Sequence, residues 1–167
     1  MSKIAGIYWD DTAAAPGISL SVYFSGCHFH CPGCHNPEAW DFNYGEEYTD
    51  EFAEKVVRML RKNGVERRLS ILGGEPLAPE NRKAVADLIR TVIEAYDDTY
   101  VYLWTGYTYE ELLPQMDEDE DLKYILSYVD VLIDGRFEID KRDTTLPLRG
   151  SSNQRIIKFV KENKKLG

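Results

Sequence analysis

Apolar and polar residues alternate along several short stretches of the chain, which is the pattern of β-strands that bury one face. The clearest example is residues 18–24, where Ile18, Leu20, Val22 and Phe24 are separated by polar or amphipathic residues. Other short apolar runs, bounded by Gly, Pro or acidic residues, indicate further strands. In chain order, the expected strands are residues 4–9, 18–24, 69–72, 100–104, 129–133 and 154–160.

Between these strands, apolar residues recur every three or four positions, which is the spacing of amphipathic helices. Thr49 is suited to cap the first helix and Gly64 to end it, while Pro79 suits the first turn of the second. Thr108 and Glu111 have the spacing of a capping box at the start of a third helix, and residues 122–128 form a fourth. The apolar stripes of the first two helices are Phe52, Val56, Met59 and Leu60, and then Val85, Leu88, Ile89, Val92 and Ile93.

Strands that alternate with helices form right-handed βαβ units, so we expect an α/β fold with a mainly parallel sheet. Four loops of distinctive composition each follow an expected strand directly. They are the Cys-rich loop after Phe24, residues 73–76 (Gly-Gly-Glu-Pro), Thr105-Gly106 and Asp134-Gly135. The carboxyl ends of parallel strands share one edge of the sheet, and ligands bind at that edge. We therefore expect the four loops to form one site.

Length and composition limit the class of protein. A chain of 167 residues fits one domain, residues 1–167, and is shorter than the roughly 250 residues of a closed eight-fold (βα) barrel. Its content of 43% hydrophobic and 29% charged residues is that of a globular protein. No stretch is long and apolar enough to span a membrane, and Asp10 and Asp11 come too early for a signal peptide. We expect a cytoplasmic protein without a membrane partner.

Charge is distributed unevenly along the chain. The 20 basic and 29 acidic side chains give 20 − 29 = −9, and this excess argues against a nucleic-acid partner. Residues 149–167 hold six Lys or Arg and one Glu, a net charge of +5, which leaves −14 for residues 1–148. This basic end is either a solvated tail or a surface for an acidic partner. The acidic run 117–121 is expected to be a solvated turn, with divalent-ion binding as the alternative.

The three Cys and the three His of the chain all lie between Cys27 and His35. Cys27, Cys31 and Cys34 have the spacing C-x3-C-x2-C, and the Gly and Pro residues among them indicate a loop. In a reducing compartment, such a group of thiolates is typical of a zinc site or an iron–sulfur cluster. Three unligated Cys are the remaining interpretation.

The number of thiolates bears on the choice between the two metals. A structural zinc site takes four protein ligands, and one of the three His could be the fourth. A [4Fe–4S] cluster usually takes four Cys, and this chain has three. A cluster on three Cys keeps one iron open to an outside ligand, which a substrate-binding cluster requires. The residues favour the cluster and leave zinc open.

A C-x3-C-x2-C motif followed by a Gly-Gly-Glu-Pro loop after the next strand resembles the radical S-adenosylmethionine (SAM) enzymes. Further blocks resemble, within that superfamily, the activating proteins of anaerobic ribonucleoside-triphosphate reductases. These blocks lie between about residues 15 and 157 and are residues 25–37, 104–107, 129–135 and 148–155. The sequence Arg-Gly-Ser-Ser-Asn-Gln-Arg at 149–155 narrows the resemblance to these activases.

The resemblance implies a role for each matching residue in binding the cofactors. Cys27, Cys31 and Cys34 would bind three irons of one [4Fe–4S] cluster, and the amino and carboxylate groups of SAM would bind the fourth iron. Two further sets would contact SAM: Gly73, Gly74 and Glu75 at its amino group, and Gly33 and His35, on either side of Cys34, at its adenine. Glycine permits close backbone approach, and carbonyl or carboxylate oxygens accept hydrogen bonds from an ammonium. Glu75 could instead cap the helix that begins at Pro79.

The resemblance also implies a fold and an activity. The fold would be a partial, open (βα) barrel of the radical SAM type, with a rim that leaves room for a loop of a protein substrate. An electron from flavodoxin or ferredoxin would cleave SAM to methionine and a 5′-deoxyadenosyl radical, which would generate a glycyl radical on the anaerobic ribonucleoside-triphosphate reductase. The alternatives are a radical SAM enzyme for a small molecule or another glycyl-radical enzyme, and a zinc-stabilised binding module.

One part of the family pattern is absent. Where the family has Asn-Gly-Pro-Gly-x-Arg, this chain has residues 14–19, Ala-Ala-Pro-Gly-Ile-Ser, so Ser19 stands in place of the Arg. Two groups of polar residues are left without a settled role. Asp130 and Asp134 are either turn formers at strand ends or functional residues, and Arg149, Asn153 and Arg155 either close the rim or contact a partner.

Overall fold

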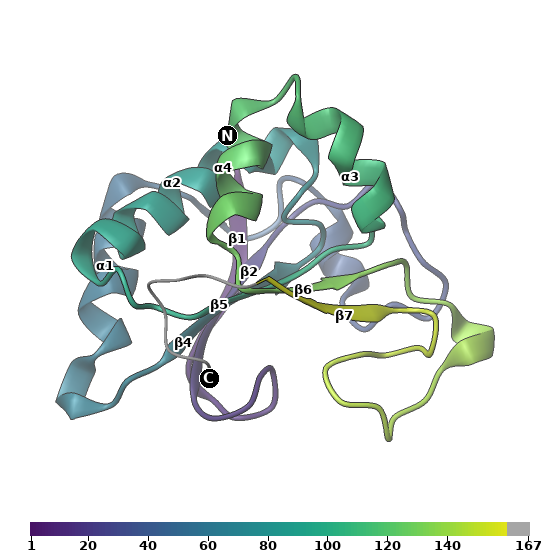
Figure 1. The fold of residues 1–167 in the computed structure, drawn as a ribbon, viewed down its shortest axis with the longest axis horizontal. Helices are drawn as coiled ribbons and strands as arrows, with labels where there is room; N and C mark the ends of the chain where they lie inside the picture. The colour runs from purple at the N-terminus through teal and green to yellow at the C-terminus, as the bar shows by residue number, and fades with distance from the viewer. Residues whose placement is uncertain (160–167) are drawn as a thin grey trace.

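One mixed sheet of seven strands runs through the computed structural model, which describes residues 1–159 (Figure 1). The strand order is β3-β1-β2-β4-β5-β6-β7. Pairing is parallel from β2 to β6 and antiparallel at the two edges, where β1 pairs with β2 and β3, and β7 with β6. The strands are β1 (Lys3–Asp11), β2 (Ser19–Phe24), β3 (Glu46–Glu47), β4 (Arg68–Gly73), β5 (Val101–Trp104), β6 (Val131–Asp134) and β7 (Arg155–Lys158).

The structure confirms the α/β class and the mainly parallel, open sheet. All six expected strands are present, and no end differs from the expected one by more than two residues. The sequence did not predict β3, because Glu46 and Glu47 are both exposed and become a strand only by pairing with Lys3 and Ile4. The last strand ends at Lys158, and residue 160 of the predicted strand lies outside the described residues.

Four helices connect the parallel strands, and local sequence signals fix where they begin. They are α1 (Asp50–Leu60), α2 (Pro79–Ala95), α3 (Tyr109–Met116) and α4 (Glu120–Tyr128), with 3₁₀ turns at Pro37–Trp40, Lys62–Gly64 and Ile139–Lys141. The Thr49 hydroxyl accepts a hydrogen bond from the Phe52 N–H, as predicted for α1. The capping box of Thr108 and Glu111 is formed in both directions.

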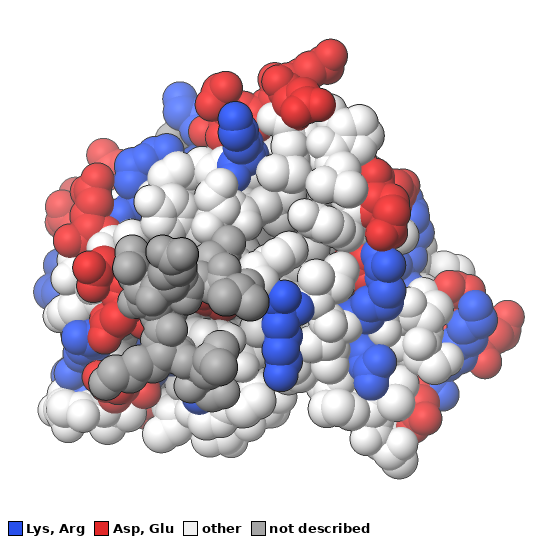
Figure 2. All heavy atoms as spheres, viewed as in Figure 1, with Lys and Arg blue, Asp and Glu red and all other residues white. Residues whose placement is uncertain are grey.

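The acidic run 117–121 covers the turn between α3 and α4 and the first two residues of α4. Acidic side chains gather on the surface over this turn (Figure 2). Asp119 is partly withdrawn from solvent, because it caps α4 through the Leu122 N–H and pairs with Arg82 at 3.0 Å. A solvated turn is therefore correct for Asp117 and Glu118, which are exposed, whereas Asp119 fixes the start of a helix.

The helices cover one face of the sheet, and the other face carries two long loops (Figure 1). The main core lies between the helices and the sheet, and each fully buried Leu or Ile in it contributes about 1.5–3 kcal/mol. On the loop face, a small second cluster packs Ala15 against Tyr102, Val131 and Ile133. None of the helices in residues 1–159 is both long and apolar enough to cross a membrane.

Candidate cluster and cofactor site

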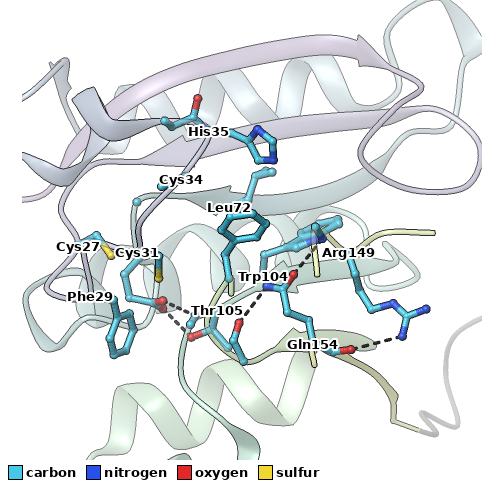
Figure 3. Close-up of a pocket in the computed structure, with 18 of the residues that line it drawn as sticks. Cys27, Phe29, Cys31, Cys34, His35, Leu72, Trp104, Thr105, Arg149 and Gln154 are labelled. Atoms are coloured by element: carbon cyan, nitrogen blue, oxygen red, sulfur yellow. Dashed lines mark hydrogen bonds between the residues drawn. The ribbon is translucent and has the colours of Figure 1, made fainter. Parts of the chain in front are cut away.

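A cavity of about 370 Å³ lies where the parallel strands β4, β5 and β6 end (Figure 3). The strand register explains the position of the cavity. Phe24 pairs with Gly73 and Trp104 pairs with Ile133, so the loops that follow these strands begin side by side at the same edge of the sheet. All four loops singled out in the sequence contribute to its wall, as expected for the carboxyl edge of a parallel sheet. The predicted site residues that line it are Cys27, Cys31, Cys34, His35, Gly73, Gly74 and Glu75.

The three Cys belong to one loop whose backbone is fixed at both ends. The Cys27 N–H donates to the Trp40 carbonyl at 3.1 Å, and the Cys34 N–H donates to the Cys31 carbonyl at 3.1 Å. Cys27 is buried, while Cys31 and Cys34 are partly exposed. Burial raises the pKa of the Cys27 and Cys31 thiols, so binding of a metal to these thiols at neutral pH releases protons.

The donor set of three Cys thiolates fits an iron–sulfur cluster. Among residues 1–159, no group of three His, Cys, Asp or Glu is arranged to hold one metal ion. Thiolates that share one zinc, each at about 2.3 Å, lie roughly 4 Å from one another. In a [4Fe–4S] cluster each thiolate binds a different iron, so the three sulfurs are spread around a larger object. Cys27, Cys31 and Cys34 all line one cavity, so three soft thiolates are available there for the irons of a cluster.

The loop of Gly73 and Gly74 packs backbone against backbone on the Cys loop. A Cβ on Gly73, whose φ is +124°, would lie 2.3 Å from the Phe24 carbonyl oxygen, and one on Gly74 would lie 2.5 Å from the Ala39 carbonyl oxygen. The Glu75 N–H donates to the Gly26 carbonyl at 2.7 Å. Side chains at the two glycines would force the loops apart, so this contact needs glycine at both positions.

Glu75 is buried and joins two of the loops. Its Oε2 accepts hydrogen bonds from the Leu77 N–H at 2.8 Å and the Thr105 hydroxyl at 2.7 Å, and its Oε1 accepts one from the Gly106 N–H at 2.6 Å. Burial raises the pKa of Glu75 to about 7, against the opposing effect of these donors. The alternative role as a helix cap is wrong, because the donors to the Glu75 carboxylate, which are Leu77, Thr105 and Gly106, all lie outside α2.

Gly33 does not line the cavity, although its neighbours Cys34 and His35 do. Phe137 and Ile139 pack over it, and a Cβ on Gly33 would lie 2.8 Å from the Ile139 Cδ1. The Phe137 ring lines the cavity and lies 5.8 Å from the His35 ring. Phe137 is thus a site residue that the sequence did not indicate, since it belongs to the loop after β6. Phe137 is far from residues 33–35 in the sequence and belongs to a loop, so no helical or strand periodicity marks it as their neighbour.

Asp130 and Asp134 fasten the ends of strand β6. The buried Asp130 accepts a hydrogen bond from the Val101 N–H at 2.8 Å, and the buried Asp134 accepts one from the Tyr109 N–H at 2.8 Å. Asp134 also pairs with Arg155 of β7, which bonds Glu110 at 2.6 Å. These contacts raise the pKa of Arg155. Both carboxylates therefore make hydrogen bonds that hold the two ends of β6 in place.

The block at 149–155 lies along the rim of the cavity, where Arg149, Gly150 and Gln154 line it. Arg149 lines the cavity and donates to the Gln154 carbonyl at 3.3 Å (Figure 3). The Trp104 indole N–H donates to the Leu148 carbonyl at 2.8 Å, and the Asn153 amide donates to the Arg136 carbonyl at 2.7 Å. The block thus closes one side of the rim.

Ser19, which stands where the family has an Arg, is buried and accepts a hydrogen bond from the Ser70 hydroxyl at 3.1 Å. The residue opposite it in the register is Arg68, whose guanidinium donates to the Pro16 carbonyl and lies against Gly17. A guanidinium is therefore still present at this loop, supplied by the neighbouring strand.

Comparisons with known proteins identify relatives over nearly the whole chain. Residues 13–157 match the model of a family described as a 4Fe-4S single cluster domain. The anaerobic ribonucleoside-triphosphate reductase-activating protein of Vibrio cholerae is 38% identical over 151 residues, which cover 90% of this chain and 94% of that protein. The proteins of the same name from Escherichia coli K12 and phage T4 are 32% and 34% identical, over 86% and 90% of this chain and 90% of each relative.

Proposed function

The chain belongs to the family of anaerobic ribonucleoside-triphosphate reductase-activating proteins, and from this premise we propose that it is a radical SAM enzyme that generates the glycyl radical of such a reductase. The observation that carries the proposal is the meeting of the three Cys and the Gly-Gly-Glu loop in one cavity. We further propose that residues 1–167 act as a single domain, a partial (βα) barrel of the radical SAM type.

Cys27, Cys31 and Cys34 hold the cluster in this proposal, because they are the soft donors of the cavity. A [4Fe–4S] cluster held there with one open iron would supply an electron, received from flavodoxin or ferredoxin, for cleavage of SAM to methionine and a 5′-deoxyadenosyl radical. That radical would take a hydrogen atom from a glycine of the reductase. The chain's own residues would bind and orient SAM and keep water out of the cavity.

The backbone at Gly73 and Gly74 lines the cavity and suits the ammonium of SAM, since carbonyl oxygens accept hydrogen bonds from it. Glu75 is placed behind this backbone and is engaged by three donors of the protein. Its main contribution is a fixed position for the loop, and its ionised form adds a negative charge near the ammonium. The rings of His35 and Phe137 both line the cavity and would contact the adenine, beside Cys34 and close to Gly33.

The open architecture suits a protein substrate. The sheet ends on β3 and β7 without closing, and the face opposite the helices carries loops in place of helices (Figure 1). This open side would leave room for a peptide loop of the reductase to approach the cavity, where a closed barrel would have further βα units. This favours a protein substrate over a small one.

The proposal is tested by reductive SAM cleavage with a matched pair of variants. After anaerobic reconstitution, the wild-type protein and a remote surface variant, Arg90→Gln, should release methionine and 5′-deoxyadenosine when reduced. Cys31→Ala should bind less iron and release neither product. If Cys31→Ala still cleaves SAM, Cys31 is not a required cluster ligand. If the wild-type protein holds a full cluster and never cleaves SAM, it is not a radical SAM enzyme.

A further inference from the structure

The three residues between Cys27 and Cys31 are more than a spacer. His28 and His30 are exposed, whereas Phe29 is partly buried and lines the cavity (Figure 3). Phe29 is two residues from each of the two Cys, so a contact that holds its side chain also limits where both thiols can lie. His30 has a φ of +48°, a left-handed conformation that a non-glycine residue keeps only where its surroundings hold it.

The Phe29 ring is enclosed by residues from two other strand-end loops. Its edge meets Tyr107, with ring centroids 4.9 Å apart and planes at 76°. It also lies directly on the backbone of the loop after β5, where a Cβ on Gly106 would be 2.6 Å from the ring. The Arg136 guanidinium, from the loop after β6, stands over the ring with its Cζ 4.3 Å from the centroid. Such a cation–π contact is attractive in addition to the packing of the ring.

Arg136 is itself fixed from two sides, so its place over Phe29 does not depend on any bound group. Its two terminal nitrogens each donate to a carboxylate oxygen of Glu111 at 3.1 Å. Glu111 is the capping-box residue of α3, and the pairing with Arg136, together with the Thr108 N–H, lowers the pKa of Glu111 to about 2. On the backbone side, the Asn153 amide donates to the Arg136 carbonyl at 2.7 Å.

We propose that Phe29 is a positioning residue for the cluster, held by Arg136 against the loop after β5 so that the Cys27–Cys31 segment keeps its ligand conformation before the cluster binds. The inference rests on the three Cys being ligands, and it adds what holds them in place. It also gives the block at 149–155 a role. Asn153 of this block bonds the Arg136 carbonyl and so helps to hold the Arg136 guanidinium over Phe29.

The chain offers an unusually clean test in the metal-free protein. Its three Cys all lie in this one loop, so the rate of thiol alkylation reports on the loop alone. The test variants are Phe29→Leu, which removes the ring, and Arg136→Gln, which removes the cation. The conservative variant is Phe29→Tyr. The matched control is Arg90→Gln, because Arg90 makes the same kind of contact with Tyr124 at 4.5 Å on the helical side of the molecule.

We expect Phe29→Leu and Arg136→Gln to raise the alkylation rate of the buried Cys27 by about fivefold or more, because each increases the population of open loop conformations. Phe29→Tyr and Arg90→Gln should stay within about twofold of wild type. After reconstitution, loss of iron to a chelator should accelerate in the same two test variants.

Circular dichroism and thermal unfolding of each metal-free variant separate a local from a global effect. If Phe29→Leu does not fold, the alkylation rate of Arg136→Gln tests the proposal by itself. The Arg136 side chain is 42% exposed, so its loss leaves the core intact. Alkylation rates of folded test variants within twofold of wild type would overturn the proposal, as would an equal acceleration in Arg90→Gln. None of these results depends on SAM cleavage, so a failure here is distinct from a failure of the proposed function.

Discussion

The Gly106 N–H donates to Glu75 Oε1 at 2.6 Å, and this bond joins the loops that follow two adjacent parallel strands. Glu75 also holds the Thr105 hydroxyl of the same second loop at 2.7 Å. The Phe29 ring also lies against Gly106, where a Cβ would be 2.6 Å from the ring. The cavity wall is thus a chain of contacts that runs from the Gly-Gly-Glu loop through the loop after β5 to the Cys loop.

The raised pKa of Glu75 predicts a pH dependence of stability. The folded-state pKa of about 7 lies above the ordinary value of 4.5, so the stabilising contribution is complete below pH 4.5 and is lost as the pH rises through 7. The shift corresponds to a loss of up to about 3 kcal/mol. Urea unfolding of the metal-free protein at pH 5 and pH 8 should show lower stability at pH 8. The difference should shrink in Glu75→Gln, and an equal difference in both proteins would contradict the assignment.

The contact of Gly74 with the Cys loop predicts a steric penalty for any side chain. Gly74→Ala should cost about 1–3 kcal/mol of unfolding free energy, because its Cβ would lie 2.5 Å from a backbone oxygen that cannot move freely. The matched control is Gly6→Ala, whose Cβ would have Tyr8 at 3.9 Å as its nearest contact. Chemical unfolding measures both variants. A cost for Gly74→Ala no larger than that of the control would contradict the contact.

The buried Asp134 predicts a large effect from breaking the link between β6 and β7. Asp134→Asn removes the charge that pairs with Arg155, which leaves that guanidinium with Glu110 alone as its charged partner. We expect a loss of about 1–3 kcal/mol, at the lower side of values for buried pairs because the Arg155 side chain is 47% exposed. In comparison, Lys141→Gln removes an exposed pair with Glu138 and should cost at most about 0.5 kcal/mol. Equal melting temperatures for the two variants would refute the prediction.

Metal and sulfide analysis decides between the two metals that the Cys spacing allows. Anaerobically purified or reconstituted protein should contain about four iron and four labile sulfide per chain. It should lose them together with its colour when oxygen is admitted. A zinc-stabilised module would instead contain about one zinc and no labile sulfide. That second composition, in protein that had been supplied with iron and sulfide, would overturn the cluster.

Local sequence signals predicted the elements, and tertiary contacts determined what the sequence did not show. The capping box of Thr108 and Glu111 was predictable because both partners lie within one helical turn. The sequence could not predict that Glu111 also holds Arg136 over Phe29, because these residues meet only after three strand-end loops converge. The strand β3 likewise has no signal of its own and exists through its pairing with β1.

The candidate site was predictable where its residue types are rare and its loops follow strands, as for the three Cys and the Gly-Gly-Glu loop. It was not predictable where common residues fill space, as for Phe137 over Gly33.

The hypothesis that the basic end of the chain docks a partner concerns Lys158 and three further lysines. Of these, Lys158 is in β7, and Lys161, Lys164 and Lys165 lie outside the described residues.

The central claim is tested most directly by electron paramagnetic resonance of the anaerobic ribonucleoside-triphosphate reductase after incubation with this protein, SAM and a reductant. The account predicts the doublet of a glycyl radical on the reductase, absent without SAM and absent with Cys31→Ala. A reductase that stays free of radical, while the same protein holds a full cluster and cleaves SAM, would show that its substrate is another molecule.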